Sequence, residues 1–190
     1  MNTIVPLLEL IDVRAGYSKS VVGPVTFAVH AGEVLGLQGA NGIGKTTVIK
    51  TITGGARLFG GELRRSAGLT ITHHWQRPER PPELPLTGRE MLRITGAATA
   101  SLPPRLRALC ARCLDEMSGG EFQLLHAWAC LTAPVRLALL DEPTNNLDQD
   151  AIELLLAEID RRPPDRAVLL VSHEADFLRR ACDRIVPLCP

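Results

Sequence analysis

A glycine-rich run between an apolar segment and an amphipathic segment constrains this chain more than any other feature. Residues 39–46 read GANGIGKT, which fits the pattern G-x-x-x-x-G-K-[ST] at every fixed position. Residues 34–38 are typical of a short buried strand, and residues 46–52 are typical of the start of a helix. A strand, a glycine-rich loop and a helix in this order predict a P-loop, whose backbone N–H groups and helix N-terminus surround phosphate oxygens.

The side chains of this run predict a nucleotide with a bound metal ion. Lys45 would contact the β- and γ-phosphates, and the Thr46 hydroxyl would bind Mg²⁺. A glycine-rich turn that contains a lysine by chance is the alternative. That alternative does not explain why a strand precedes the run and a helix follows it, so we interpret the run as a phosphate-binding site.

Segments of strand length alternate with segments of helical spacing along most of the chain. The predicted strands are residues 7–13, 25–29, 34–38, 69–72, 137–140, 167–171 and 185–188. The predicted helices are residues 46–52, 87–95, 106–114, 118–131, 152–159 and 174–182. Ser118 and Glu121 have the spacing of a capping box at the start of the fourth helix. The alternation predicts an α/β fold of the P-loop NTPase class, with a mainly parallel sheet covered on both faces.

Two regions are expected to depart from this alternation. The first two strands are predicted to pair in an antiparallel arrangement. Prolines make residues 77–104 rich in loops, and helices follow them. We interpret residues 77–132 as a small helical subdomain inserted in a single nucleotide-binding domain that spans residues 1–190.

The composition argues against several classes of protein. Lysine plus arginine and aspartate plus glutamate both number 21, so the formal net charge is zero, and no nucleic-acid partner is expected. No apolar run approaches the roughly 20 residues that a membrane helix needs. The N-terminus lacks the basic region and the small-residue cleavage site of a signal peptide. We therefore expect a cytoplasmic protein.

The five scattered cysteines do not predict a disulfide framework, because their number is odd. Cys110 and Cys113 form a C-x-x-C pair, which could be half of a metal site or a redox pair. The pair lies in residues 105–115, which have helical spacing, and no second pair of metal ligands lies nearby at zinc spacing. We interpret both cysteines as incidental residues of a helix.

Two carboxylates, Asp141 and Glu142, follow the predicted buried strand at residues 137–140. In P-loop proteins such a strand delivers an aspartate to the Mg²⁺ ion, and Asp141 fits this role. Glu142 could act as a general base towards the attacking water. A strand followed by a solvated acidic turn is the alternative, which the P-loop elsewhere in the chain disfavours.

A Met-Ser-Gly-Gly-Glu run at residues 117–121 makes the interpretation specific. Ser-Gly-Gly at a helix start offers a hydroxyl, close backbone approach and a positive dipole end, which together suit a γ-phosphate. With this run the chain resembles the ATP-binding cassette (ABC) family, the nucleotide-binding subunits of ABC transporters. The resemblance covers residues 8–186, and the motifs appear in the family's order at residues 39–46, 76, 117–121, 141–142, 146–148 and 172–173.

The resemblance implies roles for further residues. Tyr17 would stack on adenine, and Gln76 would contact Mg²⁺ and the attacking water. His173 would contact the γ-phosphate and hold Glu142 in place. The implied catalytic set is Glu142, His173 and Gln76, and the implied Mg²⁺ ligands are Thr46, Gln76 and Asp141.

The resemblance also implies a dimer, either of two copies or with a paired ABC subunit. The serine and glycines of the run at residues 117–121 would close over the ATP of the second subunit, and Asp148 would lie in the loop that crosses the interface. The implied nucleotide-binding set is Tyr17, Gly39, Asn41, Gly42, Gly44, Lys45, Thr46, Thr47, Ser118, Gly119, Gly120 and Asp148.

Some residues depart from the family's pattern. Met117 replaces a leucine, and Glu121 replaces a glutamine, a variant seen in the metal-import members. Leu124 and Trp128 stand where the family usually has arginines, which affects the polar contacts of that helix rather than the phosphate site.

The function that the resemblance implies is an Mg²⁺-dependent ATPase that drives separate transmembrane permease subunits from the inner face of the cell membrane. Residues 141–148 and 172–178 also resemble soluble ABC proteins of translation, but those carry two cassettes in one chain. Chromosome-maintenance ATPases carry a long coiled coil, and no heptads appear here. Residues 84–92 and the Ser-Gly-Gly-Glu run resemble zinc and manganese importer ATPases, so metal-ion import is the substrate class we expect.

Overall fold

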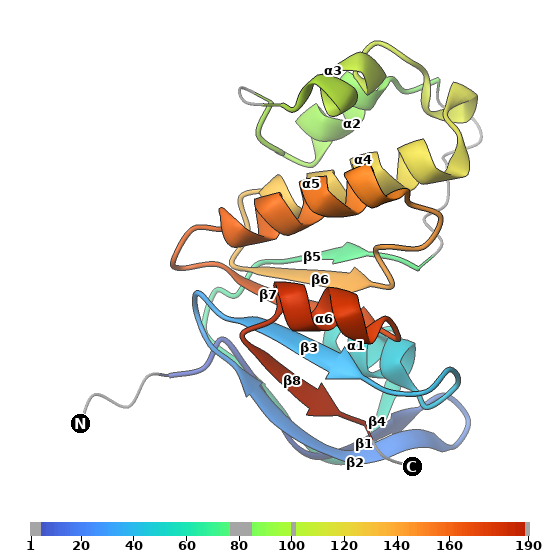
Figure 1. The fold of residues 1–190 in the computed structure, drawn as a ribbon. Coiled ribbons are helices and arrows are strands. Elements are labelled where there is room, and N and C mark those ends of the chain that lie inside the picture. Colours follow the sequence, from blue (N-terminus) through green and yellow to red (C-terminus); the bar gives the residue numbers. More distant parts are fainter. Residues whose placement is uncertain (1–4, 77–84, 100–101, 189–190) are drawn as a thin grey trace.

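The computed structural model describes residues 5–76, 85–99 and 102–188 (Figure 1). Residues 77–84 and 100–101 of the proline-rich stretch, and Cys189, lie outside this described part. The described chain forms two sheets with helices around and between them.

A five-stranded sheet lies at the centre, and all its neighbouring strands run parallel. Its order is β5 (Ile71–His74), β6 (Leu137–Asp141), β7 (Ala167–Ser172), β3 (Val34–Gln38) and β8 (Arg184–Pro187). The three middle strands are almost entirely buried, as expected for a parallel sheet covered on both faces. The predicted parallel sheet is confirmed.

Alternate residues of the middle strands enter two separate hydrophobic cores. Val34, Ala138 and Val168 face one core, which is closed by α4 (Gly119–Thr132), α5 (Gln149–Asp160) and α6 (Ala175–Ala181). Leu35 and Leu169 face the other core, which is closed by α1 (Lys45–Thr53) and the second sheet. The period of two along a strand therefore decides which layer each residue contacts.

The second sheet is antiparallel and has the order β2 (Ser20–Val29), β1 (Leu8–Gly16) and β4 (Arg57–Arg65). The predicted pairing of the first two strands is confirmed, although both extend beyond their predicted bounds. Strand β4 was not predicted. It is exposed or half-exposed at every position, so it lacks the apolar alternation that marks a strand in a sequence, and its pairing with β1 holds it in place.

The described part of the chain between β5 and β6 is helical. It begins with α2 (Gly88–Ile94) and α3 (Pro104–Leu109), followed by the 3₁₀ turn η1 (Leu114–Glu116) and then α4. The capping box expected at Ser118 is present at the start of α4, and Thr87 forms a second one with Glu90 at the start of α2. Strand β5 begins two residues after its predicted start at residue 69. The other helices and strands lie within a few residues of their predicted bounds.

The predicted helix over residues 106–114 is wrong in its second half, because α3 ends at Leu109. The chain then folds back onto the start of α2, where the carbonyls of Cys110 and Arg112 accept hydrogen bonds from the backbone N–H groups of Arg89 and Gly88. These bonds satisfy two of the N–H groups that a helix N-terminus leaves without partners. The C-x-x-C pair therefore lies in a turn, and both cysteines are free thiols.

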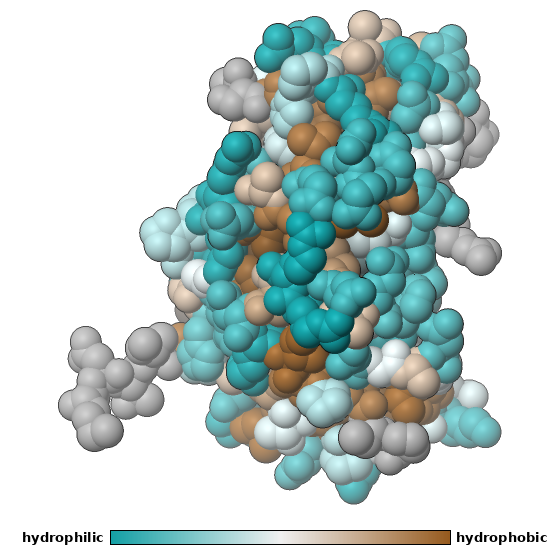
Figure 2. Space-filling view, viewed as in Figure 1, coloured by the Kyte–Doolittle hydropathy of each residue, from teal (hydrophilic) through white to brown (hydrophobic). Residues whose placement is uncertain are grey.

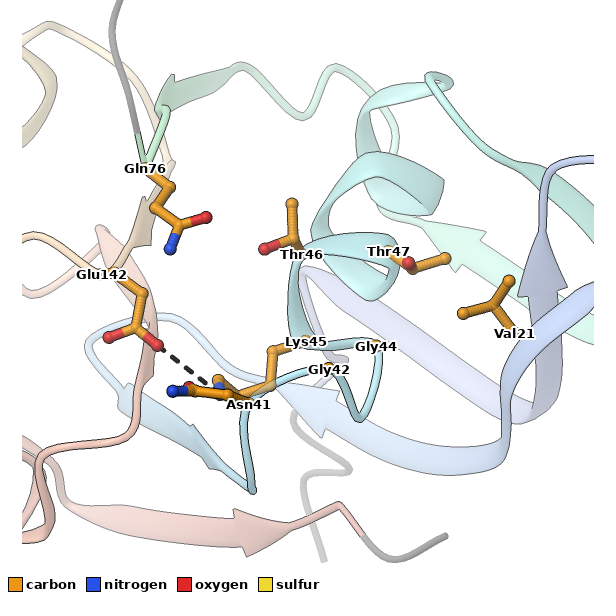
Figure 3. A pocket seen from close by; sticks show the side chains of 9 residues that line it. All are labelled: Val21, Asn41, Gly42, Gly44, Lys45, Thr46, Thr47, Gln76 and Glu142. Carbon is orange, nitrogen blue, oxygen red and sulfur yellow. Dashed lines mark ion pairs between the residues drawn. The ribbon is translucent and has the colours of Figure 1, made fainter.

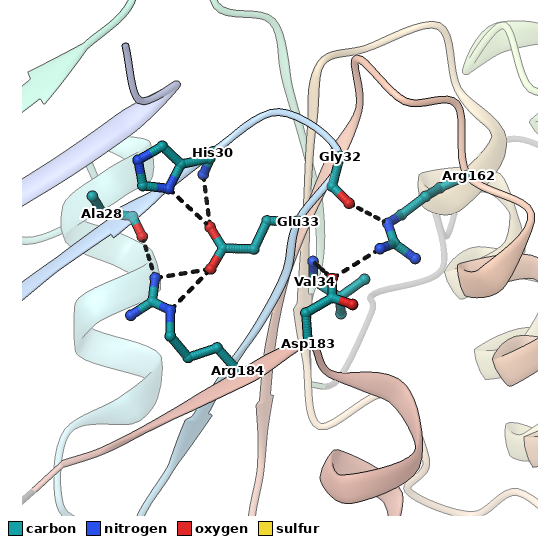
Figure 4. Close-up of polar contacts among 8 residues, drawn as sticks. All are labelled: Ala28, His30, Gly32, Glu33, Val34, Arg162, Asp183 and Arg184. Atoms are coloured by element: carbon teal, nitrogen blue, oxygen red, sulfur yellow. Dashed lines mark hydrogen bonds and ion pairs between the residues drawn. The ribbon is translucent and has the colours of Figure 1, made fainter. Parts of the chain in front are cut away.

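Polar contacts hold the amino end of the parallel sheet (Figure 4). Asp183 accepts hydrogen bonds from the Val34 backbone N–H at 2.7 Å and from Arg162 Nη2 at 2.8 Å. Glu33 pairs with Arg184 and accepts a hydrogen bond from the His30 backbone N–H. These contacts join the starts of β3 and β8. They therefore help to fix the orientation of β3, whose carboxyl end leads into the glycine-rich loop.

The described helices are all too short or too polar to cross a bilayer. On the face shown in Figure 2, hydrophilic side chains cover most of the surface and hydrophobic side chains show in smaller patches between them.

Candidate functional site

The glycine-rich loop runs from the carboxyl end of β3 to the first residue of α1. Gly44 is the residue before the helix, with a φ of 105°, and a Cβ atom there would lie 2.6 Å from Val22 Cβ. Only glycine fits both the left-handed conformation and the close approach. The N-terminus of α1 has no side-chain cap, so its N–H groups and dipole remain able to bind an anion.

A pocket of about 250 Å³ lies above this loop (Figure 3). Gln76, just after β5, and Glu142, just after β6, approach it from the side opposite α1. The pocket therefore joins the P-loop to the ends of two neighbouring parallel strands. Its lining residues are Val21, Asn41, Gly42, Gly44, Lys45, Thr46, Thr47, Gln76 and Glu142.

Lys45 provides a buried positive charge at the base of the pocket. Its Nζ donates hydrogen bonds to the carbonyl oxygens of Gly39 at 2.8 Å and Ala40 at 3.2 Å, and lies 3.5 Å from Glu142 Oε1. The side chains of Lys45 and Glu142 are only 6% and 4% exposed. A cation desolvated to this extent attracts an anion more strongly than an exposed lysine would.

Asp141 is fully buried at the end of β6, and neither of its carboxylate oxygens has a hydrogen-bond partner among the described residues. Burial raises its pKa to about 6, and the Glu142 charge adds to the rise. The nearby Thr46 hydroxyl, which forms no hydrogen bond of regular geometry with the carboxylate, and the Lys45 charge oppose the rise. A carboxylate and a hydroxyl beside a phosphate site are oxygen ligands of the kind that Mg²⁺ prefers. The unpartnered carboxylate and its donor set therefore fit a bound Mg²⁺.

We expect Asp141→Asn to stabilise the protein at pH 8 in the absence of nucleotide and divalent metal. Because the pKa rises from 3.8 unfolded to about 6 folded, ionised Asp141 costs up to roughly 3 kcal/mol above pH 6. This cost shrinks as the pH falls below 6 and vanishes below 3.8, so the gain from the substitution should vanish near pH 4. Urea unfolding of both proteins in EDTA at several pH values measures this difference in the free energy of unfolding.

The exposed acid Asp165 offers a matched control, because Asp165→Asn removes a carboxylate outside the site and should change the free energy of unfolding little at pH 8. If Asp141→Asn and Asp165→Asn change the free energy of unfolding equally at pH 8, burial of the ionised Asp141 carboxylate does not destabilise the protein.

Glu142 is held between the ends of two neighbouring parallel strands. Its backbone N–H donates to the Val171 carbonyl at 2.8 Å, and its φ of 48° turns the side chain out of the β6 line. Its Oε2 lies 2.8 Å from His173 Nδ1 and 3.3 Å from the His173 backbone nitrogen. The carboxylate is therefore fixed at the pocket with Lys45 on one oxygen and His173 on the other, which is a geometry suited to a general base.

The remaining predicted site residues lie outside this pocket. Ser118 caps α4, and Gly120 packs so tightly that a Cβ atom would lie 2.4 Å from the Asn146 carbonyl oxygen. Asp148 caps α5 and forms two hydrogen bonds with Arg105, at 2.8 and 2.7 Å. Within a single chain, the run at residues 117–121 thus contacts the loop before α5 rather than the phosphate pocket.

Tyr17 directly follows β1 and is 49% exposed, with Lys50 Nζ 5.7 Å from the centre of its ring. It does not line the described pocket.

Three contributions to the site were missed at the sequence level. Val21 lines the pocket from β2, and nothing in its surroundings in the sequence marks it. The buried Gln123 donates from Nε2 to the Glu142 carbonyl at 3.4 Å, and Thr144 contacts Glu174. The last two residues stand close to recognised motifs, but only the pairing of β6 with β7 and the packing of α4 reveal their partners.

Comparison with known proteins agrees with this geometry. The family model described as ABC transporter matches residues 22–145. The zinc import ATP-binding protein ZnuC of Roseobacter denitrificans is 32% identical over 95% of this chain and 76% of its own, and that of Cereibacter sphaeroides is 35% identical over 93% and 75%. A solved ATP-binding subunit of an ABC transporter is 30% identical, covers 96% of this chain and 85% of its own, and superposes with a TM-score of 0.80.

Proposed function

The chain belongs to the ABC transporter family, as an ATP-binding subunit and an ATPase, and from this membership we propose that it powers the import of zinc through separate membrane subunits. The zinc substrate is inferred from the relatives that are named zinc import ATP-binding proteins. Manganese is the second candidate, because residues 84–92 and the Ser-Gly-Gly-Glu run resemble both zinc and manganese importer ATPases. A role in transport is favoured over one in translation.

We propose that the pocket above the P-loop holds the phosphates of ATP. The N–H groups at the start of α1 and the Lys45 ammonium would bind the β- and γ-phosphates, and Asn41 and Thr47 lie on the pocket wall where they could add hydrogen bonds. Thr46, Asp141 and Gln76 would hold Mg²⁺. When bound, this ion supplies positive charge that offsets the charge of the phosphate oxygens.

Glu142 is proposed as the general base that accepts a proton from the attacking water. His173 Nδ1, 2.8 Å from Glu142 Oε2, would keep the carboxylate turned towards the pocket, and Gln76 would help to orient the water. The observation that supports this reading most is the placement of one buried carboxylate between Lys45 and His173. A carboxylate held in this way loses little side-chain entropy in the reaction.

The position of the run at residues 117–121 supports a dimeric site. Ser118, Gly119 and Gly120 do not line the pocket of their own chain, so we propose that they close over ATP held by a second ABC subunit. Asp148 and the loop around it would lie at the same interface, and Tyr17 would stack on the adenine. The division into a helical subdomain at residues 77–132 remains part of this proposal.

Zinc uptake by cells tests the proposed substrate. Cells that lack this chain should take up radioactive zinc more slowly at low external zinc, and the wild-type chain should restore the rate whereas Lys45→Ala should not. A membrane fraction should contain the wild-type chain together with permease subunits, as expected for a chain that acts at the inner face of the membrane. If loss of the chain slows manganese uptake and leaves zinc uptake unchanged, the substrate is manganese rather than zinc. Recovery of the chain with ribosomes would contradict the transport role.

A further inference from the structure

A hydrogen bond between Thr144 and Glu174 joins the two loops that carry Glu142 and His173. Thr144 Oγ1 donates to Glu174 Oε1 at 2.7 Å, and the Thr144 side chain is buried. Thr144 lies two residues after Glu142, and Glu174 lies one residue after His173. The bond is therefore placed directly beyond the contact between Glu142 and His173.

The backbone around this bond is already restrained. Strands β6 and β7 pair in parallel up to Asp141 and Val171, and the Glu142 N–H adds one more bond, to the Val171 carbonyl. The Glu174 backbone N–H then donates to the hydroxyl of the fully buried Ser172 at 3.0 Å. The bond between Thr144 and Glu174 continues the connection between the two strands after the ladder has ended.

His173 depends on such a restraint because its own side chain is 46% exposed. The contact of its ring Nδ1 with Glu142 Oε2 and the hydrogen bond from its backbone N–H to the same oxygen are the described interactions that hold it beside Glu142. An exposed ring loses rotamer freedom when it is held in one position, and this loss opposes the contact. A second bond across the same two loops reduces that loss by fixing the backbone on which the ring stands.

We propose that Thr144 and Glu174 are positioning residues that hold His173 against Glu142. This inference rests on the proposed function, since it assigns these residues a role in hydrolysis through the proposed base. Neither residue lines the phosphate pocket, so both act on the rate of hydrolysis and not on the affinity for ATP.

Single-turnover hydrolysis by the full chain with ATP and Mg²⁺ tests the proposal. Thr144→Val keeps the shape of the side chain but removes the donor, and it should lower the rate roughly 3- to 10-fold with little change in ATP affinity. Glu174→Ala removes the acceptor and should have the same effect. Thr144→Ser keeps the hydroxyl and Glu174→Gln keeps an acceptor oxygen, so both should stay close to the wild-type rate.

A double-mutant cycle with His173→Ala separates positioning from loss of stability. If Thr144 acts through His173, Thr144→Val should slow His173→Ala no further, whereas an independent effect would multiply the two losses. Rates of Glu142→Gln and His173→Ala in the same assay distinguish a failure of the proposed general base from a failure of the positioning role. Wild-type rates in those two variants would contradict the proposed base, and reduced rates there with a wild-type rate in Thr144→Val would contradict the positioning role alone.

Crystal structures of Thr144→Val and Glu174→Ala provide a readout that does not depend on turnover. The distance between His173 Nδ1 and Glu142 Oε2 should lie beyond hydrogen-bonding range, or the His173 ring should be disordered, in both variants. Retention of the 2.8 Å contact in both would overturn the proposal.

Discussion

Replacing Glu142 by glutamine should lower the rate of ATP hydrolysis about 10²- to 10⁴-fold while ATP still binds, because loss of a general base has effects of this size. Glutamine keeps the size and the hydrogen-bonding shape of the side chain but cannot accept a proton. Lys45, Thr46 and Asp141 remain in place, so the phosphate and metal contacts persist. Single-turnover hydrolysis and equilibrium ATP binding measure the two effects separately.

The same variant should accumulate as a dimer in the presence of ATP and Mg²⁺, because the γ-phosphate would stay intact between the two chains. Sedimentation with and without ATP detects this change in mass. Glu158→Gln is a matched control on α5, and it should hydrolyse ATP at the wild-type rate. Hydrolysis by Glu142→Gln at a rate near that of the wild type would mean that the proposed base is wrong, and His173 would then be the first residue to reconsider.

The second large effect is expected for Lys45→Ala, which should weaken ATP binding at least 10²-fold, or roughly 2.7 kcal/mol. Two changes act together. The variant loses a buried cation that would contact the β- and γ-phosphates, and it leaves the Glu142 carboxylate without the ammonium group 3.5 Å away. An uncompensated negative charge would then face the incoming phosphates, which adds repulsion to the lost attraction.

ATP affinity measured by calorimetry, together with an unfolding curve of each protein, tests this expectation. Lys19→Ala removes an exposed positive charge outside the pocket lining and should bind ATP as the wild type does. Lys45→Ala that folds normally and binds ATP with wild-type affinity would contradict the phosphate site at the P-loop.

The features that the sequence predicted correctly are those that depend on neighbouring residues. The capping box at Ser118 needs only a serine, a glutamate three residues later and the helix between them. The P-loop likewise needs only its glycines, a preceding strand and a following helix. Buried strands such as β6 and β7 can be recognised in the sequence as short apolar runs, because both faces of a parallel strand are covered.

The features that the sequence did not predict depend on partners far along the chain. Strand β4 has no apolar pattern of its own and is held by its hydrogen bonds to β1. Helix α3 ends before Cys110 because the following carbonyls bond to the start of α2, an interaction that helical spacing cannot anticipate.

The candidate site divides in the same way. The motifs identified Lys45, Asp141 and Glu142 as chemistry-bearing residues, since each stands at a recognisable end of a strand or helix. The arrangement of these residues was decided only in the tertiary structure, where the neighbouring positions of β6 and β7 bring Glu142 to His173 and Thr144 to Glu174 across about 30 residues of sequence. Sequence patterns record which local structure each segment prefers, whereas the order of strands in a sheet follows from how all the buried faces pack at once, and that order determines which side chains meet.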